Sequence, residues 1–170
     1  MRLVVIAALA GIMWAPIAPA QKIELKFDAL AAKASEKAEV DLEGALLRLA
    51  TQHGKAAAGD FLGDVKEVHV RHYEFDKEGS YSDQDLAPLR KQVSEAAGWL
   101  RILNVKEKNE STELFVLSQG GKIGSCLILS AEARQLSVVY IMGTLTLAQM
   151  RELADSDKLH DLAMAGALLK

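Results

Sequence analysis

The stretch from Trp99 to Met142, WLRILNVKEKNESTELFVLSQGGKIGSCLILSAEARQLSVVYIM, decides the fold of this chain. It holds four runs rich in aliphatic, β-branched and aromatic residues, and short polar or glycine-containing links separate them. The Gly120-Gly121 pair between two apolar runs is typical of a tight hairpin turn. Because short links join antiparallel neighbours, the stretch predicts a four-stranded meander, with strands at Trp99–Val105, Glu113–Ser118, Lys122–Leu129 and Leu136–Met142.

The last two runs of the meander are apolar on both faces. Cys126–Leu129 and Val138–Met142 show no alternation of apolar and polar residues. A strand with one face in water should alternate. The middle of the sheet is therefore expected to be covered on both sides, by helices of this chain or by a partner molecule.

Hydrophobic periodicity extends the prediction in both directions from the meander. Asp85 is expected to cap one helix, which places Pro88 in the first turn, where no helical hydrogen bond is lost. The result is an α+β fold with a mainly antiparallel sheet of about five strands, a β-α-β-β-β-β core and flanking N- and C-terminal helices. The further expected elements are a strand at Val65–Phe75, an extended segment at Ala38–Leu42, and helices at Phe27–Ala34, Asp41–His53, Asp85–Ala97, from Thr146 onward and in the tail Leu159–Lys170.

The first twenty residues have the layout of a secretory signal peptide. Arg2 precedes the apolar run Leu3–Trp14, and Ala18-Pro19-Ala20 is a small-residue cleavage pattern. The apolar run is shorter than the roughly 20 residues that span a bilayer. We expect cleavage after Ala20, a periplasmic or secreted location and a single domain over residues 21–170, with a retained leader that acts as an anchor as the alternative.

Composition excludes several classes of function. The chain has 20 basic and 23 acidic residues, a formal net charge of −3, and the two signs are interspersed. No basic stripe indicates nucleic-acid binding, and no polybasic tract indicates anionic lipid. No segment after the leader is long and apolar enough to be an integral membrane helix. Cys126 is the one cysteine, so we expect a packing role, with an intermolecular disulfide as the alternative.

Residues with catalytic or metal-binding chemistry do not form a recognisable pattern. His69 and His72 are three apart on a predicted strand and should therefore point to opposite faces, where they cannot share a metal ion. The glycines at 120, 121 and 124 do not have the spacing of a phosphate-binding loop. Five acidic residues cluster in sequence without an EF-hand pattern: Glu74, Asp76, Glu78, Asp83 and Asp85. They are interpreted as a weak cation site, and two of them alternatively as helix N-terminal residues. We assign no catalytic, cofactor-binding or metal-ligating residue and no cofactor.

Three segments resemble parts of DUF4252, an exported bacterial family known as a domain of unknown function: Ser137–Leu147, Val70–Phe75 and Phe27–Leu30. The first of them is similar to the closing strand–glycine–helix segment of that family. The resemblance implies an exported α+β protein without defined functional residues, often encoded beside envelope-stress or sigma-factor genes. It therefore implies an accessory role in envelope signalling. Some relatives are lipoproteins, whereas this chain has no cysteine at the cleavage site and is expected to be soluble or peripherally attached.

Three functions are compatible with these observations. The first is a non-enzymatic envelope protein that binds another envelope protein or a second copy of itself, because a catalytic constellation is missing and the sheet is apolar on both faces. The second is a small-ligand or lipid-binding module, which predicts an internal cavity of a few hundred Å³, roughly the usual ligand scale. The third is a hydrolase that uses His69 or His72 beside a carboxylate in a cleft.

Overall fold

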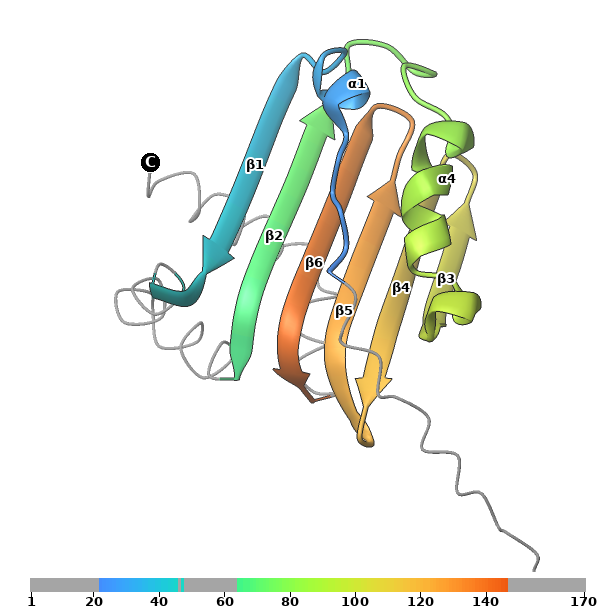
Figure 1. Ribbon diagram of the computed structural model, residues 1–170. Helices are drawn as coiled ribbons and strands as arrows, with labels where there is room; N and C mark the ends of the chain where they lie inside the picture. The colour runs from blue at the N-terminus through green and yellow to red at the C-terminus, as the bar shows by residue number, and fades with distance from the viewer. Residues whose placement is uncertain (1–21, 46, 48–63, 147–170) are drawn as a thin grey trace, which may run out of the picture.

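The fold is one antiparallel sheet of six strands, in the order β1-β2-β6-β5-β4-β3 (Figure 1). We describe it from a computed structural model, which covers residues 22–45, 47 and 64–146. The strands are β1 (Glu36–Glu43), β2 (Val65–Glu74), β3 (Trp99–Glu107), β4 (Glu110–Gln119), β5 (Lys122–Ala131) and β6 (Gln135–Leu145). The helices are α1 (Asp28–Ala31), α4 (Asp83–Gln92) and the 3-10 helix η1 (Glu95–Ala97).

The predicted meander is confirmed. Strands β3, β4, β5 and β6 pair in sequence order, each antiparallel to the next. Gly120 and Gly121, with φ of 59° and 79°, form the turn between β4 and β5, a conformation that glycine adopts without a steric penalty. Strand β6 then pairs with β2 on its other edge, so it lies in the centre of the sheet.

The sixth strand, which contains the extended segment predicted over Ala38–Leu42, is a correction to the prediction of about five. It also moves the start of the helix expected at Asp41, because residues 44, 45 and 47 are helical and the residues before them belong to the strand. Strand β1 runs through Glu43 and pairs with β2 along its whole length. Its period-two pattern alternates buried Val40 and Leu42 with exposed acidic residues, so pairing with β2 outweighs the local resemblance of Asp41 to a helix cap. Of the helix predicted over Asp41–His53, residues 46 and 48–53 lie outside the described part of the chain.

The helix predicted over Asp85–Ala97 begins earlier and ends earlier than expected. Ser82 precedes the first turn of α4, and its N–H and hydroxyl both donate to Asp85 Oδ2 at 2.8 Å. These two bonds lower the pKa of the Asp85 carboxyl. Because α4 starts at Asp83, Pro88 lies inside the helix rather than in its first turn, which corrects that expectation. Helix α1 is also shorter than its predicted range Phe27–Ala34.

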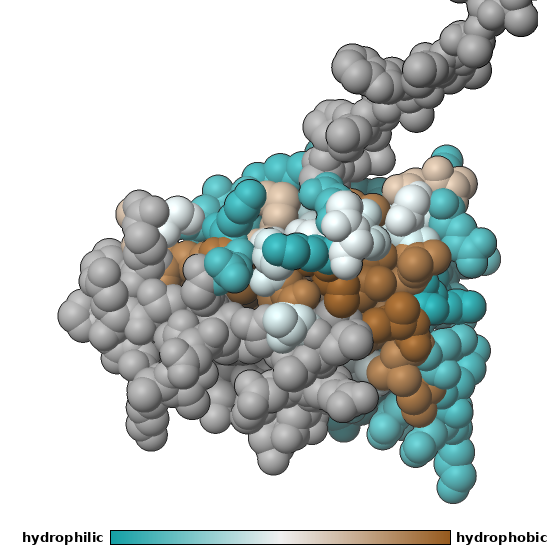
Figure 2. All heavy atoms as spheres, turned by 90° about the horizontal axis from the view of Figure 1, so that it is seen from below, coloured by the Kyte–Doolittle hydropathy of each residue, from teal (hydrophilic) through white to brown (hydrophobic). Residues whose placement is uncertain are grey.

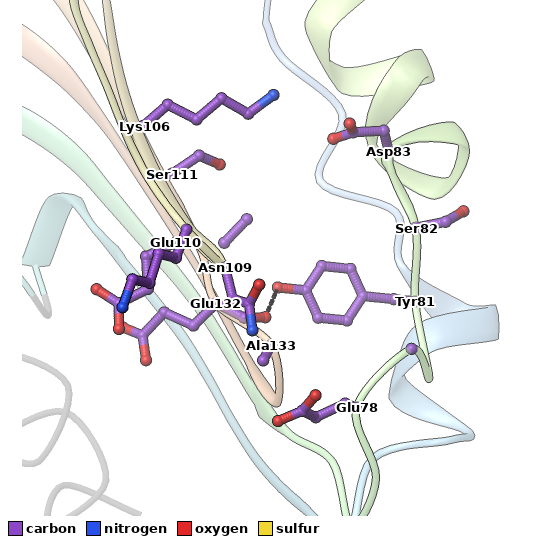
Figure 3. A pocket seen from close by; sticks show the side chains of 13 residues that line it. Glu78, Tyr81, Ser82, Asp83, Lys106, Asn109, Glu110, Ser111, Glu132 and Ala133 are labelled. Atoms are coloured by element: carbon purple, nitrogen blue, oxygen red, sulfur yellow. Dashed lines mark hydrogen bonds between the residues drawn. The ribbon is translucent and has the colours of Figure 1, made fainter.

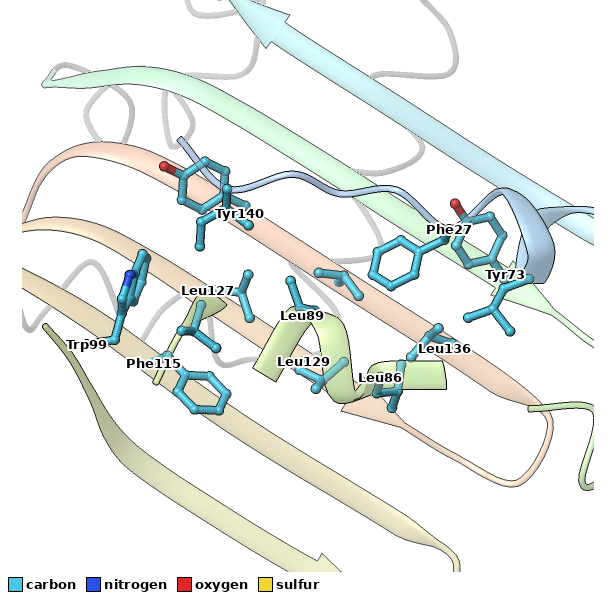
Figure 4. Packing of buried hydrophobic residues seen from close by; sticks show 14 of the residues in the cluster. Phe27, Tyr73, Leu86, Leu89, Trp99, Phe115, Leu127, Leu129, Leu136 and Tyr140 are labelled. Carbon is cyan, nitrogen blue, oxygen red and sulfur yellow. The ribbon is translucent and has the colours of Figure 1, made fainter. Parts of the chain in front are cut away.

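The helices and the N-terminal segment cover one face of the sheet, here called the helix face (Figure 1). Glu24 and Gln92 exchange hydrogen bonds of 2.8 and 3.1 Å, which tie the N-terminal segment to α4. Beneath them lies an aromatic-rich core in which side chains from α4 pack onto the sheet (Figure 4). Its largest fully buried members are Trp99, Tyr73, Tyr140, Phe75, Leu30, Leu86, Leu127, Leu129 and Leu136.

The opposite face of the sheet carries a second, aliphatic core. Within the described residues, Leu47 is the one member that does not come from a strand. The buried side chains on both faces agree with the apolar character predicted for both faces of the central strands. This core contains Val40, Val68, Val70, Leu114, Val116, Cys126, Ile128, Val139 and Ile141.

Cys126 belongs to this second core and is fully buried. Burial raises the pKa of its thiol to about 12, so the group stays protonated and inert. The packing role is confirmed. In the part of the chain covered by the structure, no helix has the length and apolar character needed to cross a bilayer. The predicted leader over residues 1–20 and the predicted C-terminal helices, from 147 onward, lie outside the described residues.

Candidate functional site

Strand β3 forms one edge of the sheet and exposes its side chains. In the described part of the chain it pairs with β4 and with no other strand. Figure 2 shows hydrophobic side chains reaching the surface on the side of the molecule where β3 lies in Figure 1. The large apolar side chains exposed on β3 are Leu100 (54%), Ile102 (48%), Leu103 (36%) and Val105 (43%). We call these four residues the β3 patch.

The start of β3 is anchored to the core. Trp99 is buried on the helix face, and its ring lies 6.5 Å from that of Tyr140. Two residues on, Arg101 Nη1 donates to the buried carboxylate of Glu113 at 3.0 Å. Arg90 on α4 donates to the other oxygen of Glu113 at 2.8 Å. Glu113 therefore joins α4, β4 and β3 and keeps the exposed edge in a fixed position.

A second candidate site is a polar cluster between β1 and β2 on the helix face. His69 is 8% exposed, and its ring stacks on Tyr140 at 5.8 Å. Its Nδ1 lies 2.6 Å from Asp41 Oδ1, and its Nε2 lies 3.1 Å from Glu67 Oε2 and 3.6 Å from Glu43 Oε1. A buried imidazole thus has carboxylates at both of its nitrogens.

Asp41 is held in turn by Arg71, whose Nη2 lies 2.8 Å from Oδ1 and donates to Oδ2 at 3.1 Å. Burial alone would raise the pKa of Asp41, but the hydrogen bonds from His69 and Arg71 outweigh it and lower the pKa. Asp41 is therefore an ionised acceptor, and the proton on this side of the ring belongs to His69 Nδ1. Sequence reasoning missed this cluster, because it placed Asp41 at a helix start and could not align β1 with β2.

His72 lies on the opposite face of β2 from His69, as predicted. Its Nδ1 is 2.8 Å from Ser137 Oγ on β6, and its Nε2 is 3.5 Å from Glu74 Oε1. The order serine, histidine, carboxylate is that of a hydrolase triad. Acyl transfer also needs preorganised N–H donors for an oxyanion, but β6 is paired along both edges, with β2 and β5, so its backbone groups serve the sheet ladder. The 3.5 Å separation also exceeds a good hydrogen bond.

Two open pockets lie at the end of the sheet where β4 begins and the β5–β6 turn lies. One has a volume of about 350 Å³ and the other about 410 Å³, and both are bordered by Asn109, Glu110 and Glu132. In the first, the Tyr81 hydroxyl points at the backbone of the β5–β6 turn (Figure 3) and donates to the carbonyls of Glu132 and Gln135. Burial raises the pKa of Tyr81 to about 12. The lining is polar and charged rather than apolar.

The predicted acidic cluster is dispersed in the structure. Asp83 and Asp85 occupy the first turn of α4, which confirms the helix N-terminal interpretation for these two. Asp83 accepts a bond of 3.0 Å from Arg90. Glu78 borders the first pocket, and Glu74 lies beside His72 at the end of β2. The structure does not bring these acids together around one point in the described chain.

Comparison with known proteins identifies a family. The family model described as "Domain of unknown function (DUF4252)" matches residues 32–153, which is most of the chain and includes all six strands. No curated protein and no solved structure matches the chain. The match covers the resembling segments in β2 and the closing strand, whereas Phe27–Leu30 lies before it. The chain belongs to the family of the domain of unknown function DUF4252.

Proposed function

We propose that this protein is an exported, non-enzymatic accessory of the cell envelope that binds another protein, in envelope or stress signalling. It does so by accepting an extended segment of the partner as an additional strand beside β3. The observation that carries the proposal is the β3 patch on an edge strand. Export is supported by the leader pattern at residues 2–20.

An edge strand offers a row of backbone N–H and C=O groups to an incoming strand, and pockets for alternate side chains give specificity. Leu103 and Val105 lie opposite Leu114 and Thr112 on β4. Leu114 belongs to the aliphatic core. A partner strand with apolar residues on this face would therefore extend that core past the present edge and remove the β3 patch from water, which is favourable by about 25 cal/mol per Å² of apolar surface.

The charge along β3 indicates the chemistry of the partner. Lys106 on β3 and Lys108 in the turn after it give this edge two positive charges against the negative charge of Glu107, although the chain as a whole is negative. The charge of Arg101 is already paired with Glu113. Complementary charge favours encounter and fixes register. We infer a partner segment that is extended, apolar at alternate positions and acidic at its flanks.

The alternatives have weaker geometric support. A lipid or small-ligand module should enclose an apolar cavity, whereas the two pockets described above are open and polar-lined. A hydrolase based on His72 and Ser137 would use a serine in the middle of a sheet ladder. A hydrolase based on His69 would use a ring whose two nitrogens already face carboxylates.

Site-specific photocrosslinking tests the proposal. A photoreactive amino acid replaces Leu103 on β3 or, as the matched control, the exposed Lys37 on the other edge strand, in cells that make the full chain. We expect a covalent adduct with one envelope protein from position 103 and none from position 37. The purified partner should then bind Val105→Asp at least about tenfold more weakly than the unchanged protein, since a buried charge on this face opposes burial.

Three results would contradict the proposal. Equal adducts from both positions would show that β3 has no special role. Equal affinity of the Val105→Asp variant would place the contact elsewhere. An adduct between two copies of this chain would show that β3 pairs with a second copy of the protein and not with a different envelope protein.

A further inference from the structure

The three potential metal ligands of the cluster between β1 and β2 lie at the spacing of a tetrahedral site. His69 Nε2 is 3.1 Å from Glu67 Oε2 and 3.6 Å from Glu43 Oε1, and all three ligand atoms lie within 4.8 Å of one another. Around a tetrahedral zinc ion with bonds of about 2.0–2.1 Å, neighbouring ligand atoms are roughly 3.3 Å apart. The two separations from Nε2 bracket that value, and the Glu43 and Glu67 oxygens lie within 4.8 Å of each other, so an ion fits once the exposed Glu43 carboxylate closes on it.

The imidazole is fixed in the orientation that a metal ligand needs. Asp41, held by Arg71, accepts the Nδ1 proton of His69 at 2.6 Å, and Tyr140 stacks against the ring. A carboxylate on the second ring nitrogen is the usual outer partner of a metal-bound histidine, because it sets the tautomer and raises the basicity of Nε2. The lone pair of Nε2 then points toward Glu67 and Glu43.

The contact between Nε2 and Glu67 requires a hydrogen or a metal ion between the two atoms. With Nδ1 as the donor to Asp41, a neutral His69 ring presents a lone pair to a carboxylate oxygen 3.1 Å away, and two acceptors repel at that distance. Either a proton or a metal ion must lie between them. A metal ion also reaches Glu43, which a proton on Nε2 does not.

The surrounding charge also calls for a cation. Glu43 on β1 and Glu67 on β2 are direct cross-strand partners, and like charges in that arrangement are destabilising. Lys22 Nζ stands 3.5 Å from Glu43 and 3.7 Å from Glu67, although its side chain is largely exposed. The Lys22 ammonium therefore lies where the two carboxylates attract a cation. A divalent ion bound directly by His69, Glu67 and Glu43 would be held more tightly than this exposed side chain.

We propose that this protein binds one zinc ion at the β1–β2 edge, through His69 Nε2 and the carboxylates of Glu67 and Glu43, with Asp41 as the positioning residue. An imidazole with two carboxylates suits zinc, whereas calcium and magnesium take oxygen ligands. The ion takes the place of the Nε2 proton and displaces Lys22, and water completes the tetrahedron. This site lies on the edge opposite the β3 patch and does not depend on the proposed protein partner.

Titration with ZnCl2 tests the site. The purified protein, stripped with a chelator, is titrated in competition with a fluorescent zinc indicator, and bound metal is counted by mass spectrometry after dialysis. We expect one equivalent of zinc per chain, and a weakening of at least about tenfold in Glu67→Gln and His69→Gln, since each removes one of three ligands. Asp41→Asn should weaken binding by about 10- to 100-fold through the orientation of the ring.

The matched control is His72→Gln, which removes the second histidine of β2, a half-buried one on the opposite face, and should leave zinc affinity unchanged. Lys22→Gln should bind zinc as tightly as the unchanged protein or more tightly. Glu43→Gln, at a half-exposed side chain that folding tolerates, should also weaken binding and decides the matter if His69→Gln does not fold. X-ray absorption of the zinc complex should show a shell of nitrogen and oxygen at about 2.0 Å.

Binding of much less than one equivalent of zinc by the unchanged protein would overturn the proposal. The proposal would also fail if Glu43→Gln and Glu67→Gln bound zinc as tightly as the unchanged protein. It would fail as well if His72→Gln lost as much zinc affinity as His69→Gln. A sulfur-containing shell in the absorption spectrum would assign the metal to other residues.

Discussion

The two edges of this sheet are built in opposite ways. Strand β1 alternates buried Val40 and Leu42 with acidic residues, and these acids are engaged by Arg71, His69 and Lys22. Strand β3 exposes four large apolar side chains instead. Charges on an edge strand discourage the addition of another chain, whereas an apolar edge invites it. The difference indicates that a protein can close one end of its sheet to association and keep the other end available.

The largest effect is expected at the anchor of the apolar edge. Trp99→Ala removes the largest fully buried side chain, at the residue where β3 begins, and should lower the free energy of unfolding by about 3–5 kcal/mol. Urea denaturation measures the change. The neighbouring Leu100→Ala, at a side chain that is more than half exposed, is the control and should cost less than about 1 kcal/mol. Equal losses would mean that β3 is not held by Trp99.

The next effect concerns the carboxylate that joins α4 to the apolar edge. Glu113→Gln leaves Arg90 and Arg101 without their shared negative partner and should destabilise the fold by about 2 kcal/mol. The figure is below that for a fully buried pair because both arginines reach water. Asp83→Asn, which removes only the exposed partner of Arg90, should cost less than about 0.5 kcal/mol in the same denaturation experiment. A larger loss in Asp83→Asn would contradict this assignment.

At the charged edge, stability should depend on pH through Asp41. Its pKa is lower in the folded protein than its ordinary value of 3.8, so folding favours the ionised form. The stabilisation is complete above the unfolded-state pKa and is lost as the pH falls through the lower folded-state pKa. Because Asp41 is half exposed, we expect less than about 1 kcal/mol.

Urea midpoints of the unchanged protein and of Asp41→Asn, measured from pH 6 down to about pH 2.5, check this expectation. The gap between the two proteins should be constant above about pH 5 and should shrink on acidification. Glu36→Gln, at the exposed start of β1, should run parallel to the unchanged protein. A gap that widens in acid would mean that folding raises the pKa of Asp41 instead of lowering it.

The smallest effect on stability is expected from adding charge to the apolar edge. Val105→Lys should change the free energy of unfolding by no more than about 0.5 kcal/mol, because the side chain is exposed. It should nevertheless raise solubility and reduce any concentration-dependent association seen by sedimentation velocity. The same substitution at the buried Val116 on β4 should destabilise strongly. If Val105→Lys unfolds the protein, the side chain at position 105 is buried by another part of the protein and the β3 edge is not accessible.

The contrast also separates what sequence could and could not predict. The meander was predictable because its pairings are local and Gly120-Gly121 marks a turn between neighbours. Strand β1 was predicted only as an extended segment over Ala38–Leu42. Its pairing was not predictable, because Asp41 resembles a helix cap and its partner His69 lies 28 positions away. The same distance hid the cluster of His69, Glu67 and Glu43, although the opposite faces of His69 and His72 followed from strand alternation. Pro88 was misplaced because a serine earlier than Asp85 starts the helix.

The position of β6 has a consequence for how this sheet comes into existence. Its residues come last among the six strands in sequence, yet they lie between β2 and β5. Until residue 145 has left the ribosome, β2 and β5 each have one unpaired side. The growing polypeptide then has four edge strands, β1, β2, β5 and β3, instead of two. The nascent chain therefore cannot finish its hydrogen-bonded ladder part by part, and an early stop before Gln135 would leave two separate fragments of sheet with nothing to join them.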